Sequence, residues 1–207
     1  MGKRINHEAA LSHATIQPAW VRITHWINAL AVVLMVMSGW QVYDASPIFP
    51  VLRFSSAITL GGWLGGALLW HFAVMWLLVA NFLVYLGLNF ATGRLHRKLL
   101  PISFKSLATD LVAALRGTLG HEDLTRYNAV QMFAYLTVIV DIVLIVLSGL
   151  AVWKSVQFPL LRTLMGGYDN ARVVHFLAMS VLVAFFAVHV VTVALVPRSL
   201  LLMIRGR

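Results

Sequence analysis

The 207-residue chain contains no cysteine. Disulfide bonds are therefore excluded, as are iron–sulfur clusters and structural zinc sites that depend on thiolate ligands. A haem attached covalently through a C-x-x-C-H motif is excluded for the same reason. Any haem or metal in this protein must be held by other side chains and by packing alone.

Charge is also scarce. Charged residues make up 11% of the chain and hydrophobic residues 60%, whereas a soluble domain carries roughly 25% charged residues. This composition is typical of an integral membrane protein. Four apolar segments predict one all-α domain over residues 1–207, an integral membrane four-helix bundle with helices at about residues 23–43, 65–90, 127–153 and 173–197.

The basic residues are unevenly distributed between the two ends of the predicted bundle. Twelve of the sixteen lie in the N-terminal arm, in the loop over about residues 91–126 or in the C-terminal tail; the other connections hold only Arg53, Lys154, Arg162 and Arg172. Positive residues gather on the cytoplasmic side of a membrane. We therefore expect both termini and the long loop in the cytoplasm, and the chain as a multi-pass protein of the bacterial inner (cytoplasmic) membrane. The same rule explains the net charge of +9 without a nucleic acid partner.

The last apolar segment carries two histidines, His175 and His189, in a run with no charged residue between Arg172 and Arg198. Fourteen residues of helix separate them by about 21 Å along the axis and about 40° around it. Ionisable side chains inside a membrane usually face the protein interior or a cofactor. Two imidazoles on one face, one near each membrane surface, indicate half of the ligand set for two stacked haems.

The predicted topology supplies a partner for each of these histidines. His25 lies at the cytoplasmic start of the first helix and His71 in the outer half of the second. Depth therefore pairs His71 with His175 and His25 with His189, which predicts bis-histidine ligation of two haems. The alternative is four hydrogen-bonded structural histidines. His7, His13, His96 and His121 lie in polar segments and are expected to be solvated.

Residues around these histidines fit the same interpretation. Arg22 and Arg172 each lie three residues before a predicted ligand, and each could pair with haem propionates or be an ordinary interface arginine. Gly39 and Gly149 could admit a porphyrin edge or allow tight helix packing. Asp141, in the middle of the third helix, could serve a quinone-linked proton route, hydrogen-bond a neighbour such as Asn81, or be protonated and inert.

A weak internal repeat links the two halves of the chain. The pattern His-Phe-x-x-Met-x-x-Leu-Val-Ala-x-Phe-x-Val begins at both His71 and His175, and Ser38-Gly39 is echoed by Ser148-Gly149. The repeat predicts a duplicated helical hairpin, with coincidence among apolar helices as the alternative.

The chain resembles the bacterial cytochrome b561 family, which includes the cytochrome b subunits of nickel–iron hydrogenases and formate dehydrogenases. The resemblance covers about residues 18–198 and rests on Val21-Arg-Ile-Thr-His25-Trp-Ile-Asn-Ala-Leu, Ser38-Gly39, Trp70-His71-Phe and the His175–His189 spacing. It implies the same histidine pairing, a quinone site beside one haem and a redox partner on a membrane face. Three segments are similar to members that accompany periplasmic molybdopterin oxidoreductases: Gly61-Gly-Trp-Leu-Gly-Gly, Ala91-Thr-Gly-Arg-Leu and Tyr127-Asn-Ala-Val-Gln.

We therefore expect a membrane dihaem b-type cytochrome with two non-covalent haem b (heme b) groups. It would transfer electrons between the quinone pool and a periplasmic oxidoreductase as an electron-transfer subunit of a respiratory chain. The alternative implied by the same resemblance is a stand-alone superoxide:quinone oxidoreductase, with the outer basic residues steering the anion. Asn28, Asp141 and Lys154 are possible neighbours of a quinone site, and the spacing favours none of them. A haem-free transporter or scaffold would leave the pairing by depth unexplained.

Overall fold

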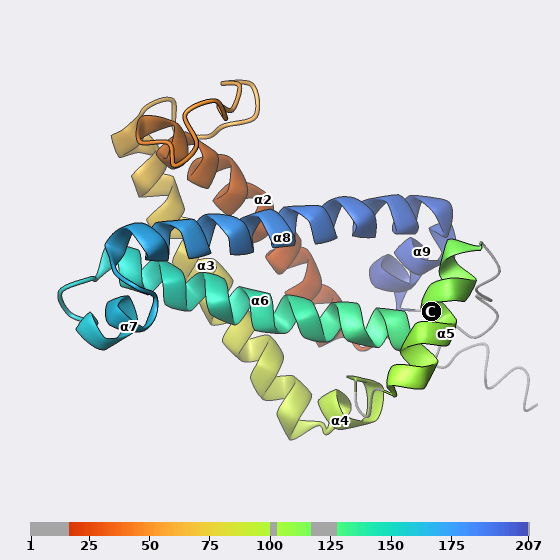
Figure 1. The fold of residues 1–207 in the computed structure, drawn as a ribbon. Helices are drawn as coiled ribbons and strands as arrows, with labels where there is room; N and C mark the ends of the chain where they lie inside the picture. The colour runs from red at the N-terminus through yellow and green to blue at the C-terminus, as the bar shows by residue number, and fades with distance from the viewer. Residues whose placement is uncertain (1–16, 100–102, 117–127, 207) are drawn as a thin grey trace, which may run out of the picture.

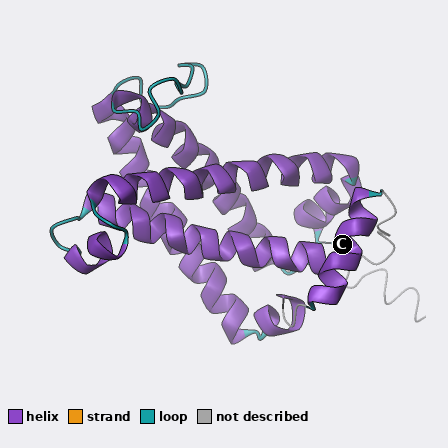
Figure 2. Ribbon diagram, in the orientation of Figure 1, coloured by secondary structure: helices purple, strands orange, loops and turns teal. Residues whose placement is uncertain are grey.

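Four long helices dominate the computed structural model, which describes residues 17–99, 103–116 and 128–206. They are α2 (Ala19–Ala45), α3 (Leu64–Ala91), α6 (Ala129–Trp153) and α8 (Tyr168–Leu195), shown in Figure 1. At 25 to 28 residues each, they measure about 38 to 42 Å, enough to cross a hydrocarbon layer of about 30 Å. The described part contains no strand (Figure 2). The predicted all-α class with four spanning helices is confirmed.

Two of these helices begin earlier than hydrophobicity predicts. α2 starts at Ala19, directly after Pro18, and α8 starts at Tyr168. Gly166 and Gly167, with φ of 80° and 105°, turn the chain into α8 through a region that other residues avoid. The expected starts, near residues 23 and 173, marked the apolar core, whereas helical hydrogen bonding continues into the polar flanks.

The long helices form two hairpins, α2 with α3 and α6 with α8. Backbones approach closely within each hairpin, while close approach between spanning helices of different hairpins is rare among the described residues. In Figure 1, α6 and α8 run side by side and cross the first hairpin. Residues 46–63 and α7 (Pro159–Leu164) make the two hairpin turns at one end of the bundle, which we call the outer end.

The opposite, inner end carries three shorter helices: α4 (Arg94–Leu99), α5 (Phe104–Leu115) and α9 (Pro197–Arg205). The first two occupy the described part of the segment expected as a loop over about residues 91–126. α9 turns back onto the start of α2, where Arg22 donates to the Ile204 carbonyl at 2.7 Å. The inner end is thus covered by short helices, whereas the outer end is closed by the two turns.

The hairpins meet in a layer of apolar side chains in the middle of the bundle. All four long helices contribute to this core layer: Ala31, Val32, Val74, Leu78, Ile145, Ala178 and Leu182. On α8, Ala178 and Leu182 lie between His175 and His189. The core layer therefore divides the bundle into an outer and an inner half, each with histidines of its own.

Candidate functional site

Two pairs of histidines face each other across the boundary between the hairpins. In the outer half, the rings of His71 on α3 and His175 on α8 have centroids 6.4 Å apart and planes at 74°. In the inner half, the rings of His25 on α2 and His189 on α8 have centroids 6.0 Å apart and planes at 68°. Each pair takes one ring from each hairpin, and α8 contributes to both. The structure brings together the same residues that depth alone had paired.

These separations match those of two imidazoles bound to one metal ion. A metal–nitrogen bond is about 2.0 Å, and the centre of an imidazole ring lies about 1.15 Å beyond its nitrogen, so two collinear ligands have centroids about 6.3 Å apart. The observed 6.4 and 6.0 Å are close to that value. Both pairs therefore have a spacing at which their two imidazoles could hold one metal ion between them.

The number of ligands also favours haem over a bare metal ion. Within the residues that the structure describes, no group of three or more histidine, cysteine, aspartate or glutamate side chains could hold a metal ion. A haem iron needs only two axial ligands from the protein, because the porphyrin supplies the other four. Two imidazoles with no third protein ligand fit a haem and leave a protein-only zinc site incomplete.

Serine side chains hold both rings of the outer pair. Ser38 Oγ lies 3.1 Å from His71 Nδ1, and Ser148 Oγ lies 3.1 Å from His175 Nδ1. The Ile145 carbonyl oxygen is a further 3.0 Å partner of His175 Nδ1. Because a carbonyl can only accept, Nδ1 of His175 carries the proton and its Nε2 keeps a lone pair for a metal.

A glycine follows each of these serines and lies against the same ring. A Cβ atom on Gly39 would lie 3.4 Å from Cε1 of His71, and one on Gly149 would lie 3.2 Å from Cε1 of His175. Of the two expected roles, the structure favours close packing: Gly149 leaves room for an imidazole from the neighbouring helix, whereas a Cβ on Gly39 would make an ordinary van der Waals contact with His71. The contacts are equivalent in the two hairpins, as the sequence repeat predicts.

The inner pair is supported by aromatic rings. Phe185, four residues before His189 on α8, stacks on the His189 ring with centroids 5.7 Å apart and planes at 9°. Trp26 lies edge-on to His25 at 5.4 Å. Among the described residues, no hydrogen bond to either imidazole is found. The two pairs therefore differ in how their rings are held, by serine and backbone oxygens in one and by aromatic packing in the other.

Comparison with known proteins places this arrangement in a family. The family model of prokaryotic cytochrome b561 matches residues 16–206. The chain belongs to the prokaryotic cytochrome b561 family. It is also 60% identical over 191 residues, 92% of this chain and 96% of the relative, to the Azospira oryzae protein named "Putative protein-methionine-sulfoxide reductase subunit YedZ1". No solved structure matches the chain.

Family membership and the fold together establish the general class of this cytochrome. It is a multi-pass bacterial membrane protein, a haem b cytochrome of electron transfer. The facing histidine pairs are the residues in the described structure whose spacing suits that cofactor.

The two arginines predicted to pair with haem propionates contact protein carbonyls. Arg172 donates to the Ser46 carbonyl, across the outer end from α8 to the end of α2. Arg22 donates through Nη1 to Ile204, and its Nε is buried without a partner among the described residues. That orphaned donor, three residues from His25, is suited to a carboxylate. The propionate role stays a prediction for both residues.

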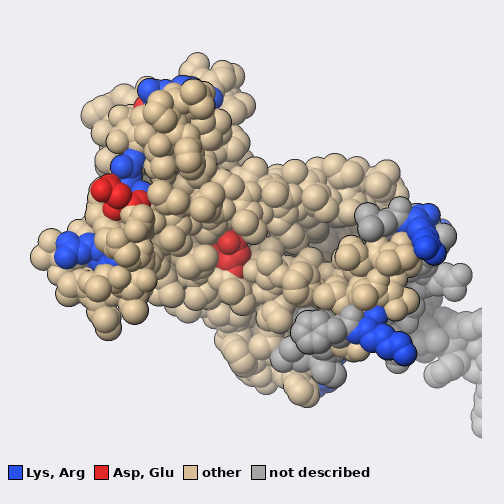
Figure 3. All heavy atoms as spheres, in the orientation of Figure 1, with Lys and Arg blue, Asp and Glu red and all other residues tan. Residues whose placement is uncertain are grey.

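Asp141 is buried in α6, and its Oδ2 has no hydrogen-bond partner among the described residues. In Figure 3 an acidic patch interrupts the uncharged middle of the molecule, while lysines and arginines gather towards its ends. The suggested partner Asn81 is engaged elsewhere: its amide donates to the Thr24 carbonyl at 2.8 Å and to Asn28 Oδ1 at 2.6 Å. Both amide hydrogens are used, so a hydrogen bond from Asn81 does not satisfy Asp141.

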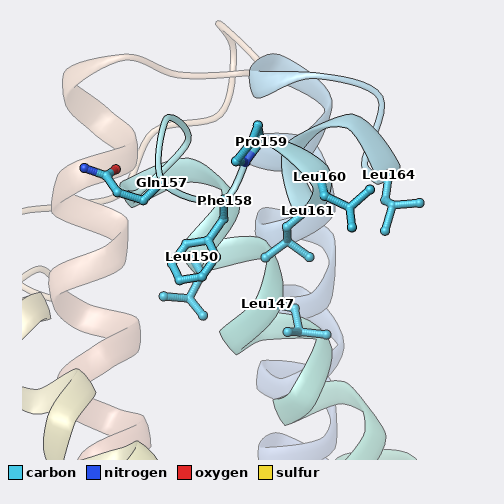
Figure 4. A pocket seen from close by; sticks show the side chains of 8 residues that line it. All are labelled: Leu147, Leu150, Gln157, Phe158, Pro159, Leu160, Leu161 and Leu164. Carbon is cyan, nitrogen blue, oxygen red and sulfur yellow. The ribbon is translucent and has the colours of Figure 1, made fainter.

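A separate apolar pocket of about 380 Å³ lies beside the outer half of α6 and α7. Figure 4 shows Leu147 and Leu150 of α6 opposite Phe158 and the leucines of α7. None of the four paired histidines lines it. Of the histidines expected to be solvated, His96 is exposed on α4, and His7, His13 and His121 lie outside the described residues.

Proposed function

We propose that this cytochrome holds two non-covalent haem b groups, one between His71 and His175 and one between His25 and His189. The observation that carries the proposal is the pair of facing imidazole sets at metal-ligand spacing, one on each side of the core layer. The two α8 ligands are about 21 Å apart along the helix axis. Two haems at these depths form an electron path through most of a layer about 30 Å thick.

The haems supply one-electron chemistry when bound, and the chain determines where it occurs. The four histidines fix the depth of each iron. Ser38 and Ser148 orient the outer rings, and the core layer excludes water between the two halves. Arg22 and Arg172 lie one helical turn from a ligand, where each can pair with a propionate.

We propose further that the electrons pass between the quinone pool and a periplasmic oxidoreductase, in a respiratory chain of the inner membrane. Support comes from the relative, whose name makes it a protein-methionine-sulfoxide reductase subunit and which shares nearly its whole length with this chain. We therefore propose a periplasmic reductase of that type as the partner, of the molybdopterin class expected from the sequence. The distribution of lysine and arginine predicts that the outer histidine pair lies on the periplasmic side, where that partner would bind.

A haem count with histidine variants tests the ligand assignment. We expect two b haems per purified chain by pyridine haemochrome. His71→Ala or His175→Ala should remove one haem, and His25→Ala or His189→Ala the other. His96→Ala is the matched control, because that ring is exposed on α4. One haem in the wild type, or loss of both haems in every single variant, would contradict the assignment.

Assays of haem reduction by quinol and of quinone reduction by superoxide distinguish the two candidate functions. The electron-transfer proposal predicts that a quinol reduces both haems and that the purified chain alone shows no quinone reduction by superoxide. Rapid superoxide-dependent quinone reduction would instead support the stand-alone enzyme. Arg53 and Arg172 lie at the outer end, where their side chains donate to the Asp44 and Ser46 carbonyls. At that end the two arginines could serve either function.

A further inference from the structure

The two outer histidine rings have the same kind of contacts, one set in each hairpin. Each ring lies against a Ser-Gly pair on the other helix of its own hairpin, Ser38-Gly39 for His71 and Ser148-Gly149 for His175. Both serines are fully buried. The inner rings have no equivalent among the described residues, since they are packed by aromatic side chains. Among the described residues, the Ser-Gly contact is therefore found only at the outer histidine pair.

The hydrogen bonds of the serines fix the direction of each contact. Ser38 Oγ lies 2.8 Å from the Leu34 carbonyl, and Ser148 Oγ lies 2.7 Å from the Leu144 carbonyl. A hydroxyl has one proton, and these carbonyls take it. The lone pairs of each Oγ are then turned to the ring, so Nδ1–H donates and the serine accepts.

The backbone reinforces the same polarity. Ile145 places its carbonyl 3.0 Å from Nδ1 of His175. Nδ1–H of His175 therefore faces a serine oxygen and a carbonyl oxygen, and Nδ1–H of His71 faces the oxygen of Ser38. Acceptors on the far nitrogen of a metal-bound imidazole increase the basicity of the coordinating nitrogen.

We propose that Ser38 and Ser148 are positioning residues that fix the outer imidazoles and lower the midpoint potential of the outer haem. The proposal rests on the haem ligation of the proposed function. More basic axial ligands stabilise ferric over ferrous iron, so the one-electron reduction becomes less favourable. The serines also hold the ring planes at 74°. No proton leaves in this step, because Nδ1 keeps its hydrogen in both oxidation states.

The test uses the full-length protein carrying both haems. Ser38→Ala and Ser148→Ala are compared with Ser180→Ala. Ser180 is an α8 serine that donates to the Phe176 carbonyl at 2.8 Å, and among the described residues it has no hydrogen bond to a histidine. Redox titration gives the midpoint potentials, and low-temperature electron paramagnetic resonance of the ferric haems reports ring orientation. We expect each of the first two variants to raise the potential of one haem and shift its resonance, with the other haem unchanged. Ser180→Ala should alter neither.

Cysteine variants keep the experiment decisive if an alanine variant loses haem. Ser38→Cys and Ser148→Cys keep a side-chain atom beside each ring and offer a weaker acceptor, so the potential of the outer haem should still rise. Unchanged potentials and resonances in both pairs of variants would overturn the proposal and leave the serines as packing residues. A wild-type protein without two haems would instead overturn the proposed function, which separates the two failures.

Discussion

At the residue scale, the two glycines beside the outer rings give a graded prediction. Gly149→Ala places a Cβ 3.2 Å from Cε1 of His175, while Gly39→Ala places one 3.4 Å from His71. We expect Gly149→Ala to lower the outer haem content more than Gly39→Ala, because the new Cβ would be too close to His175 and would make an ordinary contact with His71. Pyridine haemochrome counts measure the effect. Gly87→Ala is the control, since a Cβ there meets nothing within 4 Å; equal losses in all three variants would contradict the steric explanation.

Asp141 leads to a prediction about stability. A buried carboxyl with an unpaired oxygen costs about 1 to 3 kcal/mol relative to a satisfied group. Asp141→Leu should therefore raise the temperature at which the protein loses its Soret absorbance on heating, with the haem content unchanged. Asp141→Asn tests the proton route separately: slower haem reduction by quinol in a protein of full haem content would support that role. A destabilised Asp141→Leu variant would show that the carboxylate has a partner.

The sequence predicted which histidines meet but not how they are held. Pairing by depth needs only the topology and the helical rise, and the structure brings the same four rings together. The contact of Ser38 with His71 depends on the rotational register of two helices, which apolar patterns do not determine. The repeated Ser-Gly and His-Phe patterns predict a duplicated hairpin, but the pattern itself does not show that the serine and histidine side chains meet.

At the element scale, the start of α6 has a cap that can be tested. The Asn128 side chain accepts from the Gln131 backbone N–H at 2.8 Å, and the Gln131 side chain accepts from the Asn128 N–H at 3.2 Å. Replacing such a cap by alanine costs about 1 kcal/mol. Asn128→Ala should lower the thermal unfolding midpoint, and Asn128→Ser should largely restore it. An unchanged midpoint in the alanine variant would contradict a stabilising role of the cap.

Element boundaries were the weaker part of the sequence prediction. The apolar cores of α2 and α8 were recognised, but both helices begin several residues before the expected start. The segment expected as a loop over about residues 91–126 contains α4 and α5. Hydrophobicity reports the part of a helix that lies in lipid, and it gives no information on helices that lie outside it.

At the scale of the whole molecule, the histidine pairs connect hairpins that otherwise pack mainly within themselves. Removing both proposed α8 ligands with His175→Ala and His189→Ala should leave four spanning helices whose two hairpins separate more easily. Limited proteolysis and thermal unfolding in detergent should show faster cleavage and a lower midpoint than in the wild type. His96→Ala again serves as the control. Unchanged protease resistance in the double variant would mean that the core layer alone holds the hairpins together.

The position of α8 as the last spanning helix bears on how the protein is made. During synthesis α2 and α3 are made first, and they carry His25 and His71. These two histidines lack their facing imidazoles until His175 and His189 of α8 have been made. In the proposed arrangement, no haem can gain both axial ligands until the final span has entered the membrane. In that arrangement, haem binding would depend on complete insertion, and a prematurely terminated chain could not hold a fully ligated haem.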